Sequence, residues 1–182
     1  EQFKGEIAIV GNTSIDAISR YGLKPVIGTK VIVTMHRREN WHHMRDFFIS
    51  IETLAERYTT LEFVLPLHPN PAIRELAPIF KRVRVCEPLD HKNMCSLLAE
   101  CNCVISDSGG IQEEASYLGK RIFCCRYATE RVELTSTYLV FTPTPESLLS
   151  EFRPQETLLE QSTIYGTGQS SGLINVFLGV LS

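Results

Sequence analysis

The sequence predicts an α/β fold, namely a Rossmann-like parallel sheet with helices on both faces. Short apolar runs of strand length alternate with longer segments whose apolar residues recur at helical spacing, which is the pattern of βαβ units. Most of the short runs lead into polar residues, glycine or proline, as buried strands that end in loops do. A length of 182 residues corresponds to roughly one domain. We therefore expect one core built on one sheet.

The first strand and helix show how each element is assigned. Residues 30–35 form a continuous apolar run, which is typical of a buried parallel strand, and residues 44–58 carry apolar side chains at helical spacing. The same criteria predict, in chain order, a strand at 61–67, a helix at 71–81 that begins with Pro71, a strand at 83–86, a helix at 93–100, a strand at 103–106, a helix at 110–118, strands at 121–125 and 138–141, and helices at 146–152, 155–161 and 171–181.

The first 29 residues do not fit this alternation. Residues 7–11 resemble a strand, and residues 12–21 resemble a short helix that ends at Gly22. We therefore divide the chain into a hinge or interdomain segment at 1–29, a Rossmann-like domain at 30–165 and a C-terminal helix at 166–182.

The composition argues against several classes of protein. The net charge is −3, and the basic residues form no large cluster, so a nucleic-acid partner is not expected. No apolar run approaches the roughly 18–20 residues of a membrane span, and the N-terminus does not resemble a secretory signal, which favours a cytoplasmic location. The six cysteines include no Cys-x-x-Cys pair, so we expect buried reduced thiols and no metal site.

Polar residues follow most of the predicted strands. In a doubly wound sheet, ligands bind beyond the carboxyl ends of the strands, so these segments are the candidate site. They are residues 36–40 (HRREN), 68–71 (HPNP), 87–90 (EPLD), 107–114 (DSGGIQEE) and 126–131 (RYATER).

The clearest local signal is the turn at residues 107–110, between a strand and a helix. Glycines there let a ligand approach the backbone, and the N–H groups at the start of a helix favour a phosphate. The alternative is an ordinary helix N-cap made by Asp107 or Ser108. Glu114 lies four residues past Gly110, about 6 Å along a helix, at a distance suited to the ribose of a bound nucleotide. Glu113 is interpreted as a solvated helix residue.

Histidines and arginines near two strand ends are further candidates. His36 could act as a general acid, and Arg37 with Arg38 could neutralise a diphosphate, although a solvated charge cluster paired with Glu39 would give the same pattern. His68 fits a turn or a ligand contact equally well. The adjacent residues His42 and His43 would diverge on a helix, so we expect them at the surface.

Together these residues resemble the non-hydrolysing UDP-N-acetylglucosamine 2-epimerases. The resemblance rests on residues 31–40 (VIVTMHRREN), 68–71 (HPNP), 87–90 (EPLD), 106–115 (SDSGGIQEEA), 118–120 (LGK), 129–131 (TER) and 165–168 (YGTG), in matching order and spacing. It implies the C-terminal half of a two-domain fold of the glycosyltransferase-B type. The missing N-terminal domain would carry the carboxylates that move the proton at C2, so this chain alone is not expected to turn over substrate.

The resemblance also implies an activity and a set of roles. UDP-N-acetylglucosamine and UDP-N-acetylmannosamine would interconvert by elimination and re-addition of UDP, with no redox cofactor or metal, and the whole protein could form a homodimer. Carried over to this sequence, the roles are His36 as catalytic residue; Leu89, Met94, Ser108, Gly109, Gly110, Glu114 and Arg131 in UDP or substrate binding; and Arg37 and His68 at a regulatory site for a second substrate molecule.

Three other functions remain open on the sequence alone: a hydrolysing epimerase that releases UDP, the donor domain of a glycosyltransferase with the same architecture, and a stand-alone nucleotide-sugar binding module. Some positions depart from the family pattern. Met94 stands where an aromatic residue is common, while Ser116 and Val132 replace usual prolines.

Overall fold

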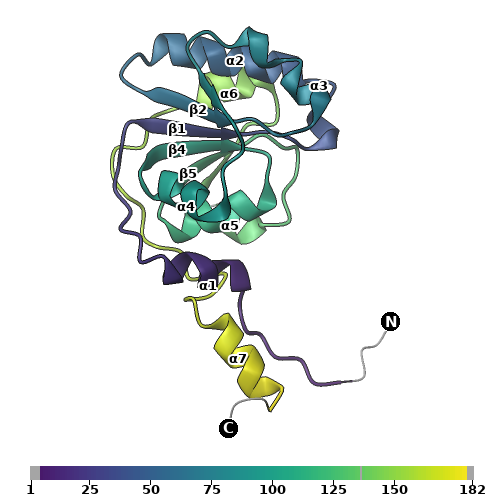
Figure 1. The fold of residues 1–182 in the computed structure, drawn as a ribbon, viewed down its shortest axis with the longest axis vertical. Coiled ribbons are helices and arrows are strands. Elements are labelled where there is room, and N and C mark those ends of the chain that lie inside the picture. The colour runs from purple at the N-terminus through teal and green to yellow at the C-terminus, as the bar shows by residue number, and fades with distance from the viewer. Residues whose placement is uncertain (1–4, 136, 180–182) are drawn as a thin grey trace.

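The protein is described by a computed structural model, which covers residues 5–135 and 137–179. One six-stranded parallel sheet forms the centre, with strand order β3-β2-β1-β4-β5-β6 (Figure 1). The strands are β1 Lys30–Thr34, β2 Glu62–Pro66, β3 Arg84–Cys86, β4 Cys101–Ser106, β5 Arg121–Cys124 and β6 Leu139–Phe141. The α/β class and the Rossmann-like arrangement predicted from the sequence are confirmed.

Helices cover both faces of the sheet. They are α1 Thr13–Arg20, α2 Met44–Arg57, α3 Pro71–Arg74, α4 His91–Ala99, α5 Gly109–Tyr117, α6 Pro145–Glu151 and α7 Ser170–Phe177, with single 3-10 turns at Arg38–Asn40, Ala77–Ile79 and Val132–Leu134. In the part of the chain that the structure describes, no helix combines the length and apolar character needed to cross a bilayer.

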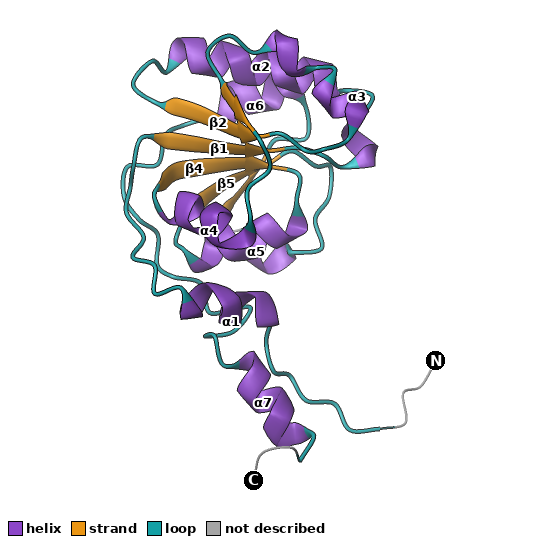
Figure 2. Cartoon of the chain, viewed as in Figure 1, coloured by secondary structure: helices purple, strands orange, loops and turns teal. Residues whose placement is uncertain are grey.

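Each face of the sheet has its own apolar core, because successive strand residues point to opposite sides. Val31 and Val33 of β1 pack with α2, α3 and α6, whereas Ile32 packs with α1, α4 and α5. Figure 2 shows these two helical layers above and below the strands. A strand buried on both faces reads as a continuous apolar run, which is why β1 was recognisable in the sequence.

Two predicted elements are wrong. Residues 7–11 form no strand, and Ile7 and Ile9 are 77% and 97% exposed, so their short apolar run does not indicate a buried strand. The helix predicted over 71–81 ends at Arg74, because Pro78 has no N–H group and its ring would clash with the carbonyl four residues earlier. The rest of that segment is only a 3-10 turn.

The helix predicted at 155–161 is also wrong, because tertiary hydrogen bonds hold this segment extended. The Gln155 side chain donates to the carbonyl oxygens of Gly119 and Thr157, at 2.8 Å each, and accepts from the Arg121 N–H at 2.7 Å. The Leu159 N–H also donates to the Gly119 carbonyl at 3.1 Å. The segment therefore closes over the turn between α5 and β5.

Hydrogen bonds tie the two terminal segments together. Buried Asp16 in α1 accepts from the N–H groups of Ser170 and Ser171 at 3.0 and 2.6 Å, at the start of α7. The Asn12 N–H donates to the Tyr165 carbonyl at 2.7 Å. Helix α7 therefore lies against α1 beyond the helical layers of the sheet, as Figure 1 shows. The last two residues of the helix predicted at 171–181 lie outside the described residues.

Candidate functional site

The candidate site lies where the chain order of the sheet changes direction. The chain passes from β1 outward to β2 and β3, then returns to form β4 on the other side of β1. Ligands of doubly wound folds bind beyond the carboxyl ends of the strands at this switch point. A cavity of about 250 Å³ opens there, lined by Thr34, Met35, His36, Pro66, Leu67, His68, Pro69, Pro88, Leu89, Met94, Ser108 and Ile111.

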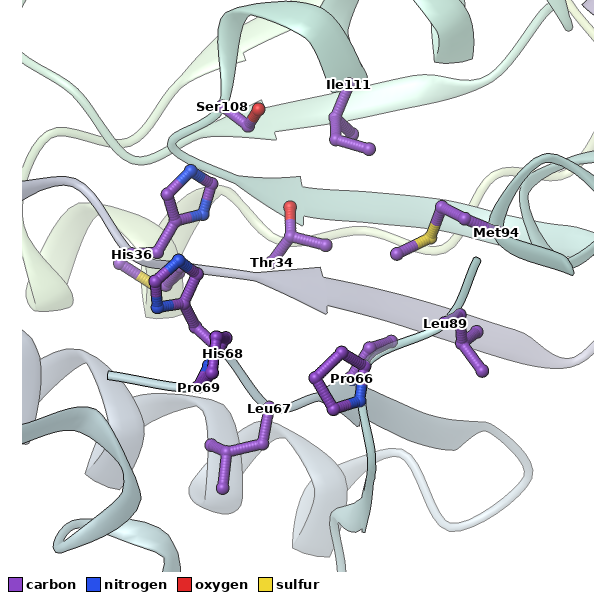
Figure 3. Close-up of a pocket in the computed structure, with 12 residues that line it drawn as sticks. Thr34, His36, Pro66, Leu67, His68, Pro69, Leu89, Met94, Ser108 and Ile111 are labelled. Carbon is purple, nitrogen blue, oxygen red and sulfur yellow. The ribbon is translucent and has the colours of Figure 1, made fainter. Parts of the chain in front are cut away.

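The cavity has a polar end and an apolar end. Figure 3 shows His36, His68 and Ser108 together at one end, and Leu89 and Met94 at the other. Five of the residues predicted from the sequence therefore line one pocket, although the loops that carry them are far apart in the chain.

A buried carboxylate, Asp107, holds the loop after β1 in place. Asp107 has no exposed surface, and its oxygens accept from the backbone N–H groups of His36 at 3.1 Å and Arg37 at 2.9 Å. It also accepts from Nδ2 of Asn40 at 3.0 Å. The same Asn40 amide donates to the Cys125 carbonyl at 2.9 Å, so the loops after β1, β4 and β5 are bound into one unit.

These bonds also settle how helix α5 begins. Ser108 is the N-cap residue by position, but its side chain makes no capping hydrogen bond, and Asp107 faces the β1 loop instead. The alternative in which Asp107 or Ser108 merely caps the helix is therefore wrong. The N–H groups of Gly109, Gly110 and Ile111 have no acceptor within the helix, because the first turn of a helix leaves them free. Ser108, directly before them in the chain, lines the cavity.

Arg131 lies against the first glycine of α5. A Cβ atom added at Gly109 would sit 3.1 Å from Cζ of Arg131, whereas one added at Gly110 would meet nothing within 4 Å. Glu113 holds this guanidinium through a 2.6 Å ion pair, and it also accepts from Nδ2 of Asn12. The interpretation of Glu113 as a solvated residue is wrong, since it is only 5% exposed and orients Arg131.

Glu114 lies one turn into α5 and outside the lining of the cavity. Its carboxylate is largely buried and lies 3.3 Å from Nε2 of His91, at the start of α4. Burial raises the pKa of Glu114, while the neighbouring His91 opposes that shift. The structure therefore places Glu114 where α5 packs against α4, in contact with a histidine that the sequence analysis did not single out.

His36 and His68 form a stacked pair. Their ring centroids are 5.1 Å apart and the planes are inclined by 8°. Burial lowers the pKa of His36, the nearby Asp107 carboxylate raises it, and His68 and Arg37 lower it further. Arg37 is half-buried next to this pair, while His42 and His43 are exposed at the surface as expected.

The supporting residues were harder to predict than those that line the cavity. Asp107 and Asn40 stand within recognised motifs, but only the fold shows that they bind each other across 67 residues of sequence. Glu39 pairs with Arg126 at 2.7 Å and not with the adjacent arginines. Asp107 could have been recognised from its position directly after the most buried strand, where an unpaired carboxylate is costly.

Comparison with known proteins gives a consistent result. Residues 1–179 match the family described as UDP-N-acetylglucosamine 2-epimerase. The enzyme of that name from Neisseria meningitidis is 33% identical in an alignment 200 positions long. The alignment covers 93% of this chain and 54% of the relative. The Bacillus subtilis enzyme is 32% identical, with coverage of 91% of this chain and 50% of the relative.

Solved structures agree with the sequence matches. The N. meningitidis epimerase bound to UDP-GlcNAc superimposes with a TM-score of 0.80 at 28% identity, over 94% of this chain and 55% of that one. The S. aureus protein MnaA with UDP gives a TM-score of 0.80 at 28% identity, over 99% and 56%. This chain thus spans about half the length of these proteins. The chain belongs to the UDP-N-acetylglucosamine 2-epimerase family.

Proposed function

We propose that this chain is the UDP-binding half of an enzyme that interconverts UDP-N-acetylglucosamine and UDP-N-acetylmannosamine. The observation that carries the proposal is the two-ended cavity at the switch point of the sheet, with an apolar end and a polar end that opens on the start of α5. A nucleoside diphosphate has the same polarity, with a flat base at one end and anionic oxygens at the other. The N. meningitidis relative was solved with UDP-GlcNAc, which agrees with this choice of ligand.

The polar end has the chemistry needed for a diphosphate. Free N–H groups and the positive end of the α5 dipole favour anions, and Ser108 adds a hydroxyl donor. Arg131, held against Gly109 by Glu113, supplies a fixed positive charge. We assign the diphosphate to Ser108, Gly109, Gly110 and Arg131.

The apolar end suits the base and the ribose. Met94 and Leu89 line it, and a methionine can pack on a flat ring through its polarizable sulfur. Leu89 would also meet the uracil through its backbone. Glu114 lies one helical turn beyond the glycine turn in α5, where its carboxylate could accept both ribose hydroxyls.

The chemistry assigned to this half is stabilisation of the leaving group. Loss of UDP from C1 places negative charge on the β-phosphate oxygen, which the start of α5 and Arg131 would stabilise. His36 could donate a hydrogen bond or a proton to that oxygen and take it back on re-addition. Removal of the C2 proton needs a base from the other half of the full-length enzyme.

Arg37 and His68, beside the same cavity, remain assigned to a second, regulatory substrate molecule. The reduced cysteines favour a cytoplasmic location.

The ribose assignment predicts the effect of Glu114→Ala. The variant loses two charge-assisted hydrogen bonds to the ribose, so UDP affinity should fall roughly 10- to 100-fold. Isothermal titration calorimetry of this chain with UDP measures the loss. Glu56→Ala removes an exposed helical glutamate far from the cavity and is the matched control. Unchanged UDP affinity in Glu114→Ala would show that the ribose binds elsewhere.

The position of His36 predicts a pH dependence of UDP binding. A bound diphosphate favours the imidazolium form and so raises the pKa of His36, which means that binding takes up a proton; affinity should rise as pH falls toward the lowered pKa that His36 has in the free protein and level off below it. Because the pKa of His36 in the free protein lies below the ordinary histidine value of about 6.5, the gain is complete only below that pH. Because UDP itself titrates near there, the quantity to compare is the pH profile of the wild type minus that of His36→Gln. His43→Gln, at an exposed position, should leave the profile unchanged. Identical profiles for wild type and His36→Gln would exclude this contact.

A further inference from the structure

A cluster of three potential metal ligands lies between α4 and α5, which pack side by side below the sheet (Figure 1). His91 and Cys95 are one helical turn apart on α4, and Glu114 faces them from α5. One ligand atom from each residue lies within 4.8 Å of the other two. No other grouping of this kind occurs in the part of the chain that the structure describes.

The separations fit a small tetrahedral ion. Bond lengths of about 2.0 Å to nitrogen or oxygen and about 2.3 Å to sulfur place the ligand atoms of a tetrahedral zinc roughly 3.3–3.6 Å apart. Nε2 of His91 lies 3.3 Å from Oε1 of Glu114 and 3.6 Å from Sγ of Cys95. The separation between Sγ of Cys95 and the Glu114 carboxylate is bounded only at 4.8 Å, so rotation of the Glu114 or Cys95 side chain would bring the third pair to bonding geometry.

The surroundings orient the histidine and leave a path to it. The hydroxyl of Tyr21 lies 3.0 Å from Nδ1 of His91, so Nδ1 can donate to that oxygen while Nε2 faces the cluster. A second hydrogen bond of this kind is usual for histidines that bind metals. The His91 side chain is 44% exposed, whereas Cys95 is buried, so an ion would enter past the imidazole and meet the thiol within.

We propose that His91, Cys95 and Glu114 form a binding site for Zn²⁺ and that Zn²⁺ and UDP exclude each other. The exclusion rests on the proposed function, because it requires Glu114 to serve the ribose in one state and the metal in the other. The site itself does not depend on that assignment.

The donor set determines which metal is expected. Thiolate and imidazole select zinc over magnesium and calcium, which prefer oxygen ligands. As the sulfur–zinc bond forms, the Cys95 thiol releases its proton to solvent, and the fourth position is left to a water molecule. A free Zn²⁺ concentration near the dissociation constant would then set the fraction of chains able to bind nucleotide.

Cobalt and zinc titrations test the site directly. Co²⁺ added to the reduced 182-residue chain should bind one ion per chain and give a thiolate-to-cobalt charge-transfer band, which Zn²⁺ then removes and Mg²⁺ does not. Cys95→Ser should abolish the band. His91→Gln changes a side chain that is 44% exposed, so the variant should fold normally and weaken Zn²⁺ binding at least tenfold. Cys86→Ser removes the half-buried thiol outside the cluster and should change nothing.

The exclusion is tested by measuring UDP affinity with and without saturating Zn²⁺. The affinity should fall at least tenfold in the wild type. The same metal should have a much smaller effect in Cys95→Ser, which separates the protein site from zinc bound by UDP in solution. Absence of the charge-transfer band, or a band that survives in both Cys95→Ser and His91→Gln, would overturn the metal site while leaving the proposed function intact. Metal binding without any effect on UDP would overturn the exclusion, and Glu114→Ala would then show whether the ribose assignment also fails.

Discussion

Gly109→Asp is expected to abolish UDP binding. The new carboxylate would stand at the first turn of α5, where the free N–H groups and the helix dipole otherwise receive the diphosphate. A Cβ atom added at this position would lie 3.1 Å from Cζ of Arg131, so the carboxylate beyond it would reach the same guanidinium. It would then pair with the charge that is assigned to phosphate. Nuclear magnetic resonance titration with UDP should show no saturable shifts at millimolar ligand.

Gly172→Asp is the matched control. It introduces the same carboxylate near the start of another helix, α7, at a position where an added Cβ meets nothing within 4 Å. Its UDP affinity should equal that of the wild type. If Gly109→Asp keeps measurable affinity while its circular dichroism spectrum is native, the diphosphate does not bind at the start of α5.

Asp107→Ala is expected to lower the free energy of unfolding by about 3 kcal/mol. Hydrogen bonds to charged groups are strong, and the donors left without an acceptor are shielded from water. Three donors lose their acceptor: the N–H groups of His36 and Arg37 and the amide of Asn40. The loop that carries His36 would also lose the bonds that fix its position, so UDP binding should weaken as well. Urea unfolding with an unchanged m value measures the loss of stability.

Asp46→Ala provides the comparison for that stability measurement. Asp46 is exposed in the first turn of α2, where its interaction with the helix dipole is worth less than about 1 kcal/mol. A loss in Asp107→Ala no larger than in Asp46→Ala would show that the buried carboxylate does not hold the loops together.

The centre of the sheet was predictable because β1, β4 and β5 are buried on both faces. Continuous apolar runs such as 31–33 do not depend on which neighbour they pair with. The failures occur where a tertiary contact decides the backbone. The Gln155 side chain donates a hydrogen bond to the Gly119 carbonyl, and no local sequence pattern indicates that bond. Residues 7–10 are a continuous apolar run like β1, yet Ile7 and Ile9 are highly exposed, since such a run does not itself create a buried strand.

The residues of the candidate site were likewise predictable only where their chemistry is local in the sequence. Residues with a recognisable motif, such as Ser108 and the glycines after it, could be named from the sequence because the chemistry is local to one turn. Glu113 was misjudged, since its role depends on Arg131, which is 18 residues away in the chain. His91 was missed because Tyr21 and Glu114, which both contact its ring, are 70 and 23 residues away from it in the sequence.

The buried thiols of this sheet have a practical consequence for measuring how the protein opens. Cys95, Cys101, Cys103, Cys124 and Cys125 are buried, and Cys86 alone among the cysteines is half-buried. Burial raises the pKa of Cys101 to about 12 and of Cys124 to about 11, so almost none of the nucleophilic thiolate exists in the folded interior at neutral pH. Alkylating reagents should therefore modify Cys86 first, and they should reach the cysteines on β4, on β5 and directly after β5 (Cys101, Cys103, Cys124 and Cys125) only when the strands separate. The number of labels on each chain, followed by mass spectrometry over time, records the rate of that opening without any introduced probe.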